Sequence, residues 1–230
     1  MKNAKILEIF QSIQGEGKYA GIKQVFVRFF ECNMHCSWCD TPNSIGDTVR
    51  NFDEMSLDQL MPKIRALKAG CSSVSLTGGE PLLQADFIKE LLPELRKEGL
   101  KNYLETNGVL PEEMAKIIDQ IDIVAMDIKL PSSTKCKPYW KEHEEFLRLA
   151  VDKDVFIKAV ITSDTHNEDI LRTTELVAKI DPHILFILQP NTYELKNGVM
   201  KRCLEFQDIC QQRLTNVRIL PQVHKFMKLR

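Results

Sequence analysis

The chain has 230 residues, of which 43% are hydrophobic and 27% charged, and its formal net charge is −1 at pH 7. This composition is that of a globular protein and not of a disordered or fibrous chain. The near balance of acidic and basic residues gives no electrostatic footprint for nucleic acid or for an anionic membrane, so we expect neither as a partner. The first residues lead into a strand-like segment without an apolar core, so we expect no signal peptide and a cytoplasmic location.

Short β-branched or aromatic segments alternate with helical patterns along the chain. Ser56 is a suitable N-cap for a helix that places Leu60 and Ile64 on one face. The pattern predicts strands at 6–10, 25–30, 73–76, 102–105, 121–128, 155–161, 184–188 and 217–220. It predicts helices that begin near Ser56 and Pro111, and helices at 86–97, 141–149, 168–180 and 200–212.

This strand–helix alternation predicts an α/β fold with a mainly parallel sheet. The right-handed crossover rule then favours a curved or closed barrel, or a doubly wound sheet. No linker-like composition divides the chain, so we expect a single domain over residues 1–230. The polar and glycine-rich motifs nearly all follow strands, at the edge where parallel α/β folds build their sites.

Three cysteines, Cys32, Cys36 and Cys39, have the spacing C-x3-C-x2-C directly after an expected strand. Thiolates bind cluster iron, and three ligands for the four irons of a cubane leave one iron open. An open iron can chelate the amino and carboxylate groups of S-adenosylmethionine, and electron transfer to the sulfonium gives a 5′-deoxyadenosyl radical that the protein must position. The spacing therefore predicts a [4Fe–4S] cluster that binds S-adenosylmethionine.

A structural zinc site is the alternative interpretation of the same cysteines. Zinc prefers four closed ligands, commonly as two pairs. The candidates for a fourth ligand are His35, Cys71, Cys136, Cys203 and Cys210, and none completes a second pair at normal spacing. We therefore expect the four remaining cysteines to be small buried hydrophobic residues, and a non-enzymatic zinc-binding module stays an alternative hypothesis.

The cysteine motif, with Trp38 before its last cysteine, resembles the first signature of the radical S-adenosylmethionine superfamily, and Gly-Gly-Glu-Pro at 78–81 resembles the second. Glycine permits close backbone approach to a ligand, and a carboxylate can accept from the methionine ammonium. Gln-Gly-Glu-Gly at 14–17, Cys-Asp-Thr at 39–41 and His-Lys at 224–225 together resemble the 7-carboxy-7-deazaguanine synthase family. A glycyl-radical-enzyme activase is a further alternative, because it shares the cysteine spacing and can carry an Asp-x-Lys after a strand.

The resemblance implies a partial (β/α) barrel of the radical S-adenosylmethionine type and a homodimer. It implies a lyase of queuosine and 7-deazapurine biosynthesis, which contracts the ring of 6-carboxy-5,6,7,8-tetrahydropterin to give 7-carboxy-7-deazaguanine with loss of ammonia. It also implies regeneration of S-adenosylmethionine, a requirement for Mg²⁺ and a flavodoxin-like electron donor. No catalytic residue is expected beyond the cluster and the cofactor radical.

Matching the family's motifs residue by residue implies a role for each of several positions. Thr41 matches the magnesium ligand, and Glu105 is expected to hold ribose hydroxyls, whereas Glu16 receives no role. The implied substrate-binding residues are Ile13, Gln14, Gly15, Arg28, Thr77 and Arg230. The implied cofactor-binding residues are Trp38, Cys39, Asp40, Gly79, Glu80, Glu105, Asp127, Ile128, Lys129, Gln189, Pro190, Asn191 and Thr192.

Two of these positions carry a further observation from the sequence. Strand alternation places Arg28 on the face opposite Val27 and Phe29, where a charge needs a partner and a guanidinium can bind the substrate carboxylate with two hydrogen bonds. Asp-Ile-Lys at 127–129 stands where many family members carry Ser-Pro-Lys.

Overall fold

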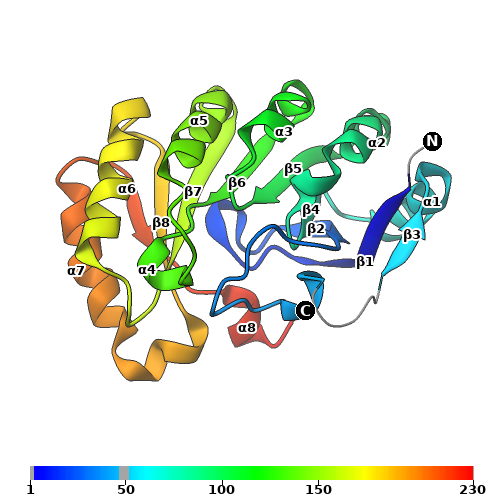
Figure 1. Ribbon diagram of the computed structural model, residues 1–230. Coiled ribbons are helices and arrows are strands. Elements are labelled where there is room, and N and C mark those ends of the chain that lie inside the picture. The colour runs from blue at the N-terminus through cyan, green and yellow to red at the C-terminus, as the bar shows by residue number, and fades with distance from the viewer. Residues whose placement is uncertain (1–2, 47–51, 230) are drawn as a thin grey trace.

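All strands of the described chain belong to one sheet, whose order is β3-β1-β2-β4-β5-β6-β7-β8-β9 (Figure 1). The computed structural model describes residues 3–46 and 52–229. Arg230, which the resemblance implies as a substrate contact, lies outside the described residues. The strands are β1 Ala4–Ile13, β2 Lys23–Phe29, β3 Asp53–Met55, β4 Ser73–Gly78, β5 Lys101–Thr106, β6 Ile123–Asp127, β7 Asp154–Ile161, β8 Leu185–Pro190 and β9 Val217–Ile219.

Helices connect most of these strands. The α-helices are α1 Leu57–Leu67, α2 Ala85–Lys97, α3 Pro111–Ala115, α4 Pro131–Thr134, α5 Trp140–Ala150, α6 Asn167–Ile180, α7 Val199–Gln211 and α8 Val223–Met227. The 3-10 helices are η1 Gly17–Tyr19, η2 Pro42–Ser44, η3 Pro81–Gln84, η4 Ile118–Gln120 and η5 Thr192–Asn197. No helix among the described residues is long and apolar enough to cross a membrane.

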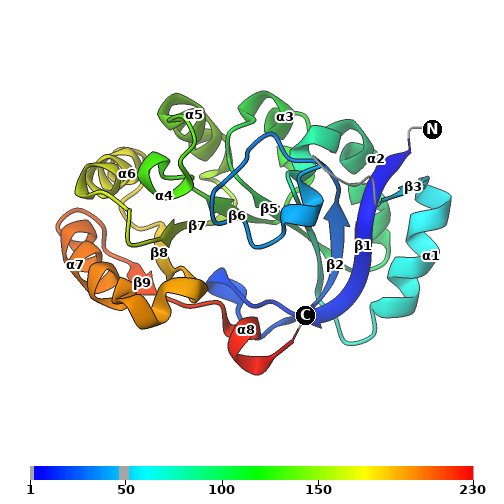
Figure 2. The same cartoon turned by 60° about the horizontal axis from the view of Figure 1, so that its bottom comes forward.

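The sheet is parallel from β2 through β9, and only β1 runs antiparallel to its neighbours β2 and β3. The larger helices cover its convex face, while the loop after β2, α4 and α8 lie around its concave interior (Figure 2). Because β3 and β9 end the sheet without pairing to each other, the barrel is incomplete. The prediction of a partial (β/α) barrel with a mainly parallel sheet is therefore confirmed.

Strand alternation divides the side chains of each parallel strand between two environments. On β7, for example, Ile157 and Ile161 pack into the main core beneath the helices, whereas Phe156 and Lys158 face the interior of the barrel. A second, smaller core fills the amino-terminal end of the interior with Tyr103, Phe156 and neighbouring aliphatic residues, against which Tyr19 of η1 packs. Apolar side chains thus fill one end of the interior, and polar side chains line the other end.

The predicted elements are all present, with ends that differ by a few residues. Ser56 caps α1 as expected, and its backbone N–H donates to Gln59 Oε1 at 2.9 Å in a capping box. Pro111 opens α3. The short strand β3 and the one-turn helices α4 and α8 were not predicted, because segments of three to five residues carry too little periodicity.

Candidate active site

One cavity at the carboxyl ends of the parallel strands collects nearly all of the predicted site residues. It is lined by residues of the loops after β1 and β2 and by strand-end residues from β4 to β8. Of the predicted residues, those in its lining are Ile13, Gln14, Gly15, Arg28, Cys32, Cys36, Trp38, Cys39, Asp40, Thr41, Thr77, Gly79, Glu105, Asp127, Lys129, Gln189, Pro190, Asn191 and Thr192. Glu80 and Ile128 are not part of this lining.

Hydrogen bonds hold the cysteine loop at its first residue and between its last two cysteines. Glu31, at φ 80°, donates its N–H to the Ser44 carbonyl at 2.9 Å, which turns the chain into the loop. On the other side, Ser37 N–H donates to the Thr134 carbonyl at 3.0 Å and Trp38 Nε1 donates to Ser133 Oγ at 2.9 Å. Because both partners belong to α4, this short helix positions the loop that carries all three cysteines.

The three thiols are partly buried and face the same cavity. Burial raises the pKa of Cys32 to about 11 and that of Cys36 to about 12, and it also raises the pKa of Cys39. Without metal these groups therefore stay protonated near neutral pH. Iron supplies the positive charge that would hold them as thiolates.

The Gly-Gly-Glu-Pro turn is joined backbone to backbone to the segment that enters the cysteine loop. Gly79 N–H donates to the Phe29 carbonyl at 3.2 Å, and Glu80 N–H donates to the Glu31 carbonyl at 2.8 Å. A Cβ atom on Gly79 would lie 2.2 Å from the Glu31 carbonyl oxygen, and one on Gly78 would lie 2.2 Å from that of Phe29. Both glycines are thus required by the packing of the chain on itself.

Glu80, which the resemblance implies as a cofactor contact, makes its hydrogen bonds to protein groups beside the cavity. Its side chain is fully buried, and its carboxylate accepts from Thr106 Oγ1 at 2.9 Å and from the N–H groups of Leu82 at 3.1 Å and Asn107 at 2.8 Å. Burial raises the pKa of Glu80 to about 7 in spite of these donors. The carboxylate therefore joins the turn after β4 to the end of β5.

Ile128 does not line the cavity, because the backbone alternates and directs the side chains on either side of Ile128 into the cavity. Asp127 and Lys129 line the cavity, and alternation turns Ile128 into the main core, where it is 1% exposed. Lys129 Nζ lies 2.9 Å from Asp127 Oδ2 and 4.9 Å from the centroid of the Trp38 ring. Burial opposes ionisation of Asp127, but Lys129 and Lys158 overcome this and lower its pKa.

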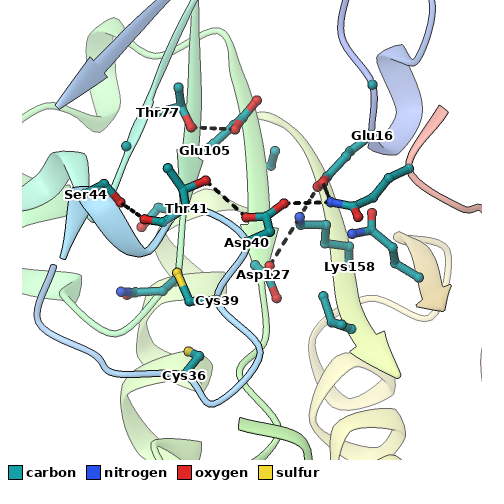
Figure 3. Close-up of a pocket in the computed structure, with 18 of the residues that line it drawn as sticks. Glu16, Cys36, Cys39, Asp40, Thr41, Ser44, Thr77, Glu105, Asp127 and Lys158 are labelled. Carbon is teal, nitrogen blue, oxygen red and sulfur yellow. Dashed lines mark hydrogen bonds and ion pairs between the residues drawn. The ribbon is translucent and has the colours of Figure 1, made fainter. Parts of the chain in front are cut away.

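Glu105 lies among residues expected to bind substrate. Gln14 Nε2 donates to its Oε1 at 2.6 Å. Thr77 Oγ1 donates to its Oε2 at 2.7 Å (Figure 3). Ser75 Oγ adds a bond of 2.9 Å to Oε1. Glu105 thus gathers hydrogen-bond donors from the loop after β1 and from β4 on one carboxylate.

Arg28 points into the cavity from β2, as strand alternation predicts. Its Nε donates to Glu8 Oε1 on the antiparallel strand β1 at 2.7 Å, and its guanidinium carbon lies 5.9 Å from the centroid of the Phe10 ring. Phe10 in turn stacks on Phe26 at a centroid distance of 5.0 Å. These contacts hold the cation against an aromatic wall of the cavity.

Two charged residues of the cavity, Glu16 and Lys158, were missed by the sequence reasoning. Lys158 forms an ion pair with Glu16 and lies 3.3 Å from Asp127 Oδ2 (Figure 3). Burial would raise the pKa of Glu16, but the Lys158 charge outweighs it and the pKa is lowered. The available signal was a lysine on the Phe156 and Val160 face of a strand, which alternation places inside the barrel.

The donor set of the cavity fits a cluster with a bound cofactor. The three thiols share one loop, and two buried acceptors of the lining, Asp127 Oδ1 and Gln189 Oε1, have no hydrogen-bond partner among the described residues. Buried acceptors are normally satisfied, so they suit a ligand that offers N–H or O–H donors. In the same described ranges, no three His, Cys, Asp or Glu side chains converge on a single metal ion.

Comparison with known proteins places the chain in a family. Residues 27–180 match the model of the radical SAM superfamily. The 7-carboxy-7-deazaguanine synthase of Geobacter sulfurreducens is 38% identical over 243 residues, which cover 97% of each chain. The synthase of Archaeoglobus fulgidus is 33% identical, with 99% of each chain covered. The chain belongs to the 7-carboxy-7-deazaguanine synthase family.

Solved structures show the same fold. The crystal structure of QueE from Escherichia coli has a TM-score of 0.66 at 23% identity and covers 96% of this chain and 95% of that chain. Streptococcus suis SuiB, solved with S-adenosylmethionine bound, has a TM-score of 0.56 at 21% identity and covers 84% of this chain and 45% of that chain. Membership of the radical SAM superfamily implies a [4Fe–4S] cluster and S-adenosylmethionine as cofactors.

Family membership decides between the hypotheses that the sequence left open. The two relatives above, which cover 97% and 99% of the chain, are 7-carboxy-7-deazaguanine synthases and not glycyl-radical-enzyme activases or zinc-binding modules. The expected burial of the other cysteines holds for Cys203 and Cys210, which are fully buried, whereas Cys71 and Cys136 are only partly buried.

Proposed function

We propose that this chain is a lyase that converts 6-carboxy-5,6,7,8-tetrahydropterin into 7-carboxy-7-deazaguanine with loss of ammonia. The observation that carries this proposal is that one cavity is lined both by the three cysteines of the cysteine loop and by Gln14, Arg28 and Thr77. The full-length similarity to synthases of the same name supports it.

Cys32, Cys36 and Cys39 would hold the cluster and leave one iron for S-adenosylmethionine, which supplies radical chemistry when it is bound. The unsatisfied acceptors Asp127 Oδ1 and Gln189 Oε1 would bind donor groups of the cofactor. Asp40 and Thr192, together with Trp38, Gly79, Lys129, Pro190 and Asn191, line the rest of its proposed site.

On the substrate side, Arg28 would bind the carboxylate of the pterin, because a guanidinium forms strong charge-assisted hydrogen bonds to that group. Gln14 and Thr77, which both donate to Glu105, lie beside the same proposed substrate site. Their amide and hydroxyl groups suit the mixed donors and acceptors of a pterin edge. Ile13 and Gly15 complete this side of the cavity. Arg230 stays a proposed contact at the chain end.

Thr41 is our proposed magnesium ligand. Its hydroxyl donates to Asp40 Oδ1 at 3.1 Å, beside the last cysteine of the motif. A single hydroxyl is a weak magnesium site, and Mg²⁺ usually keeps several waters and shares oxygens with the substrate. We therefore propose that the ion binds together with the substrate carboxylate.

Further features of the family complete the proposal. We propose that residues 1–230 act as a single domain, because every strand of the described chain belongs to one sheet. We also propose a homodimer, a flavodoxin-like electron donor and a cytoplasmic location.

The proposal is tested with protein whose cluster is reconstituted without air. The protein is incubated with S-adenosylmethionine, a reductant, Mg²⁺ and the carboxytetrahydropterin, and the products are identified by mass. We expect 7-carboxy-7-deazaguanine and ammonia. Reductive cleavage of S-adenosylmethionine without any deazaguanine would reject the proposed substrate, and stoichiometric zinc in freshly prepared anaerobic protein would reject the cluster.

A further inference from the structure

Gln222, just before α8, connects three separate loops of the cavity. Its Nε2 donates to Glu16 Oε1 at 2.7 Å and to Asp40 Oδ2 at 2.9 Å. Its Oε1 accepts from Thr192 Oγ1 at 2.6 Å. The side chain lines the cavity and the residue is only 8% exposed. Its partners are more accessible, since Asp40 is exposed and Thr192 half-buried, so these bonds are partly buried.

The three partners belong to the three binding regions of the proposed site. Glu16 lies in the loop that carries Gln14, here called the substrate loop (residues 14–17). Asp40 follows the last cysteine, in the cluster loop (residues 31–41), and Thr192 ends the cofactor segment (residues 189–192). Figure 3 shows the carboxylates of Glu16 and Asp40 pointing toward one another.

A primary amide suits this position for a chemical reason. It offers two N–H donors to two carboxylates and one acceptor to a hydroxyl, and it carries no charge. Two carboxylates that face one another would otherwise repel. Lys158 neutralises Glu16 through its other carboxylate oxygen, and Thr41 Oγ1 donates to the second oxygen of Asp40. Gln222 therefore supplies the donor that brings the two acids, and the loops that carry them, together.

The residues that follow Gln222 are fastened to the substrate loop as well. Val223 N–H donates to the Gly15 carbonyl at 2.8 Å. The His224 ring packs on Gly15 so closely that a Cβ there would lie 1.9 Å from Nδ1. The segment from Gln222 to Met227 thus rests on the substrate loop, and Gln222 extends this contact to the other two regions.

We propose that Gln222 is a positioning residue that fixes the substrate loop, the cluster loop and the cofactor segment relative to one another. The inference rests on the proposed function, and it adds a residue that contacts all three regions through other side chains. Loss of the amide would leave Glu16 and Asp40 without their shared donor. The substrate would then be held less well relative to the cofactor, so that cofactor cleavage without product formation increases.

The test compares Gln222→Met, which keeps the length of the side chain and removes the hydrogen bonds, with wild type. Gln207→Met is the matched control. Gln207 lies in α7, outside the lining of the cavity, and its Nε2 donates to the Val217 carbonyl at 3.1 Å. Gln222→Glu is a second variant, which keeps the acceptor for Thr192 and places a third carboxylate beside Glu16 and Asp40.

Two readouts are measured. The first is hydrogen exchange of the cofactor-free protein. We expect the Val223 amide to exchange ~10-fold faster in Gln222→Met than in Gln207→Met, because the variant loses the free energy of about one hydrogen bond to a charged group. The second is the ratio of 5′-deoxyadenosine to deazaguanine in the reconstituted enzyme. We expect this ratio to rise at least ~10-fold in Gln222→Met and further in Gln222→Glu.

The outcomes separate this inference from the proposed function. If Gln222→Met and Gln207→Met give the same exchange rates and the same product ratio, the positioning role is wrong even though the wild-type enzyme is a synthase. If exchange quickens but the ratio does not change, Gln222 merely anchors α8, and the positioning role is again rejected. If wild type forms no deazaguanine, the proposed function fails, and the positioning role fails with it because it rests on that function. Faster exchange of the Val223 amide in Gln222→Met would then show only that Gln222 anchors α8.

Discussion

Gln14 donates its side-chain N–H to the carboxylate of Glu105 across 2.6 Å, which joins the loop after β1 to the end of β5. The sequence assigned these two residues to different ligands, Gln14 to the substrate and Glu105 to the cofactor ribose. Because Thr77 donates to the same carboxylate at 2.7 Å, the geometry favours a place for Glu105 on the substrate side.

Glu105→Gln separates the two assignments. The variant keeps the size of the side chain but removes the charge that holds Gln14 and Thr77. We expect KM for the carboxytetrahydropterin to rise ~10-fold, as for the loss of a charge-assisted hydrogen bond, while the Kd for S-adenosylmethionine changes less than ~2-fold. Kinetics and calorimetry on the reconstituted enzyme measure both, with the exposed Glu145→Gln as control. A larger effect on the cofactor Kd would indicate that Glu105 binds the ribose of S-adenosylmethionine.

Arg28→Lys tests the carboxylate-binding role of the guanidinium. Lysine keeps the positive charge but lacks the planar fork that binds a carboxylate with two parallel bonds. We expect KM for the substrate to rise between ~10-fold and ~100-fold, with background cleavage of S-adenosylmethionine unchanged. Arg148→Lys is the matched control, because Arg148 pairs with Glu144 at 2.8 Å on the outer helix α5. Equal loss of turnover and of background cleavage would speak against substrate binding by Arg28.

The fold was predictable because its strands are buried and separated by amphipathic helices. The same alternation that placed Arg28 in the barrel also accounts for Lys158 inside and Ile128 outside. Within the site, the cysteine spacing and the glycine-rich turn were visible because their residue types are rare in other contexts.

Other parts of the site leave no local signal in the sequence. The proposed role of Gln222 depends on its hydrogen bonds to Glu16 and Asp40, which are separated from it by 206 and 182 positions in the sequence. The burial of Glu80 depends equally on a distant contact, since its partner Asn107 follows the next strand. Contacts between segments that are far apart in the chain require the folded structure.

Gly79→Ala tests whether the glycine-rich turn is required by backbone packing. Its methyl group would overlap the Glu31 carbonyl, so the turn or the cysteine loop must move. We expect less than half of the wild-type iron and sulfide per chain. We also expect a loss of unfolding free energy above ~1 kcal/mol, because an alanine that the native backbone cannot accommodate costs at least this much. Gly99→Ala is the control, because Gly99 has φ +76° with no atom within 4 Å of an added Cβ. Because Gly79 is not among the glycines with positive φ, equal iron loss in the two variants would contradict overlap as the cause.

His143 gives the protein a specific dependence of stability on pH. The residue is fully buried on α5, its Nε2 lies 3.1 Å from the Asn107 carbonyl, and burial lowers its pKa to about 4 from 6.5. Between these values the unfolded chain binds the proton and the folded chain does not, so the free energy of unfolding falls as the pH is lowered from 6.5 towards 4.

His143→Gln removes this titration and keeps a side-chain donor for the Asn107 carbonyl. Urea unfolding of the metal-free protein at pH 7 and pH 5 measures the effect. We expect wild type to lose about 2 kcal/mol more than the variant between the two pH values. The exposed His183→Gln serves as control and should follow wild type. Identical pH dependence in wild type and His143→Gln would show that another group is responsible.

The most direct test of the account is to ask whether the three thiolates leave one iron of a cubane free for the cofactor. Protein purified without air and reduced is mixed with S-adenosylmethionine carrying ¹⁵N in its amino group, and electron–nuclear double resonance of the cluster is recorded. The account predicts four irons per chain and a ¹⁵N coupling that is absent before the cofactor is added. A cluster that shows no such coupling, or a chain that holds zinc in place of iron, would contradict it.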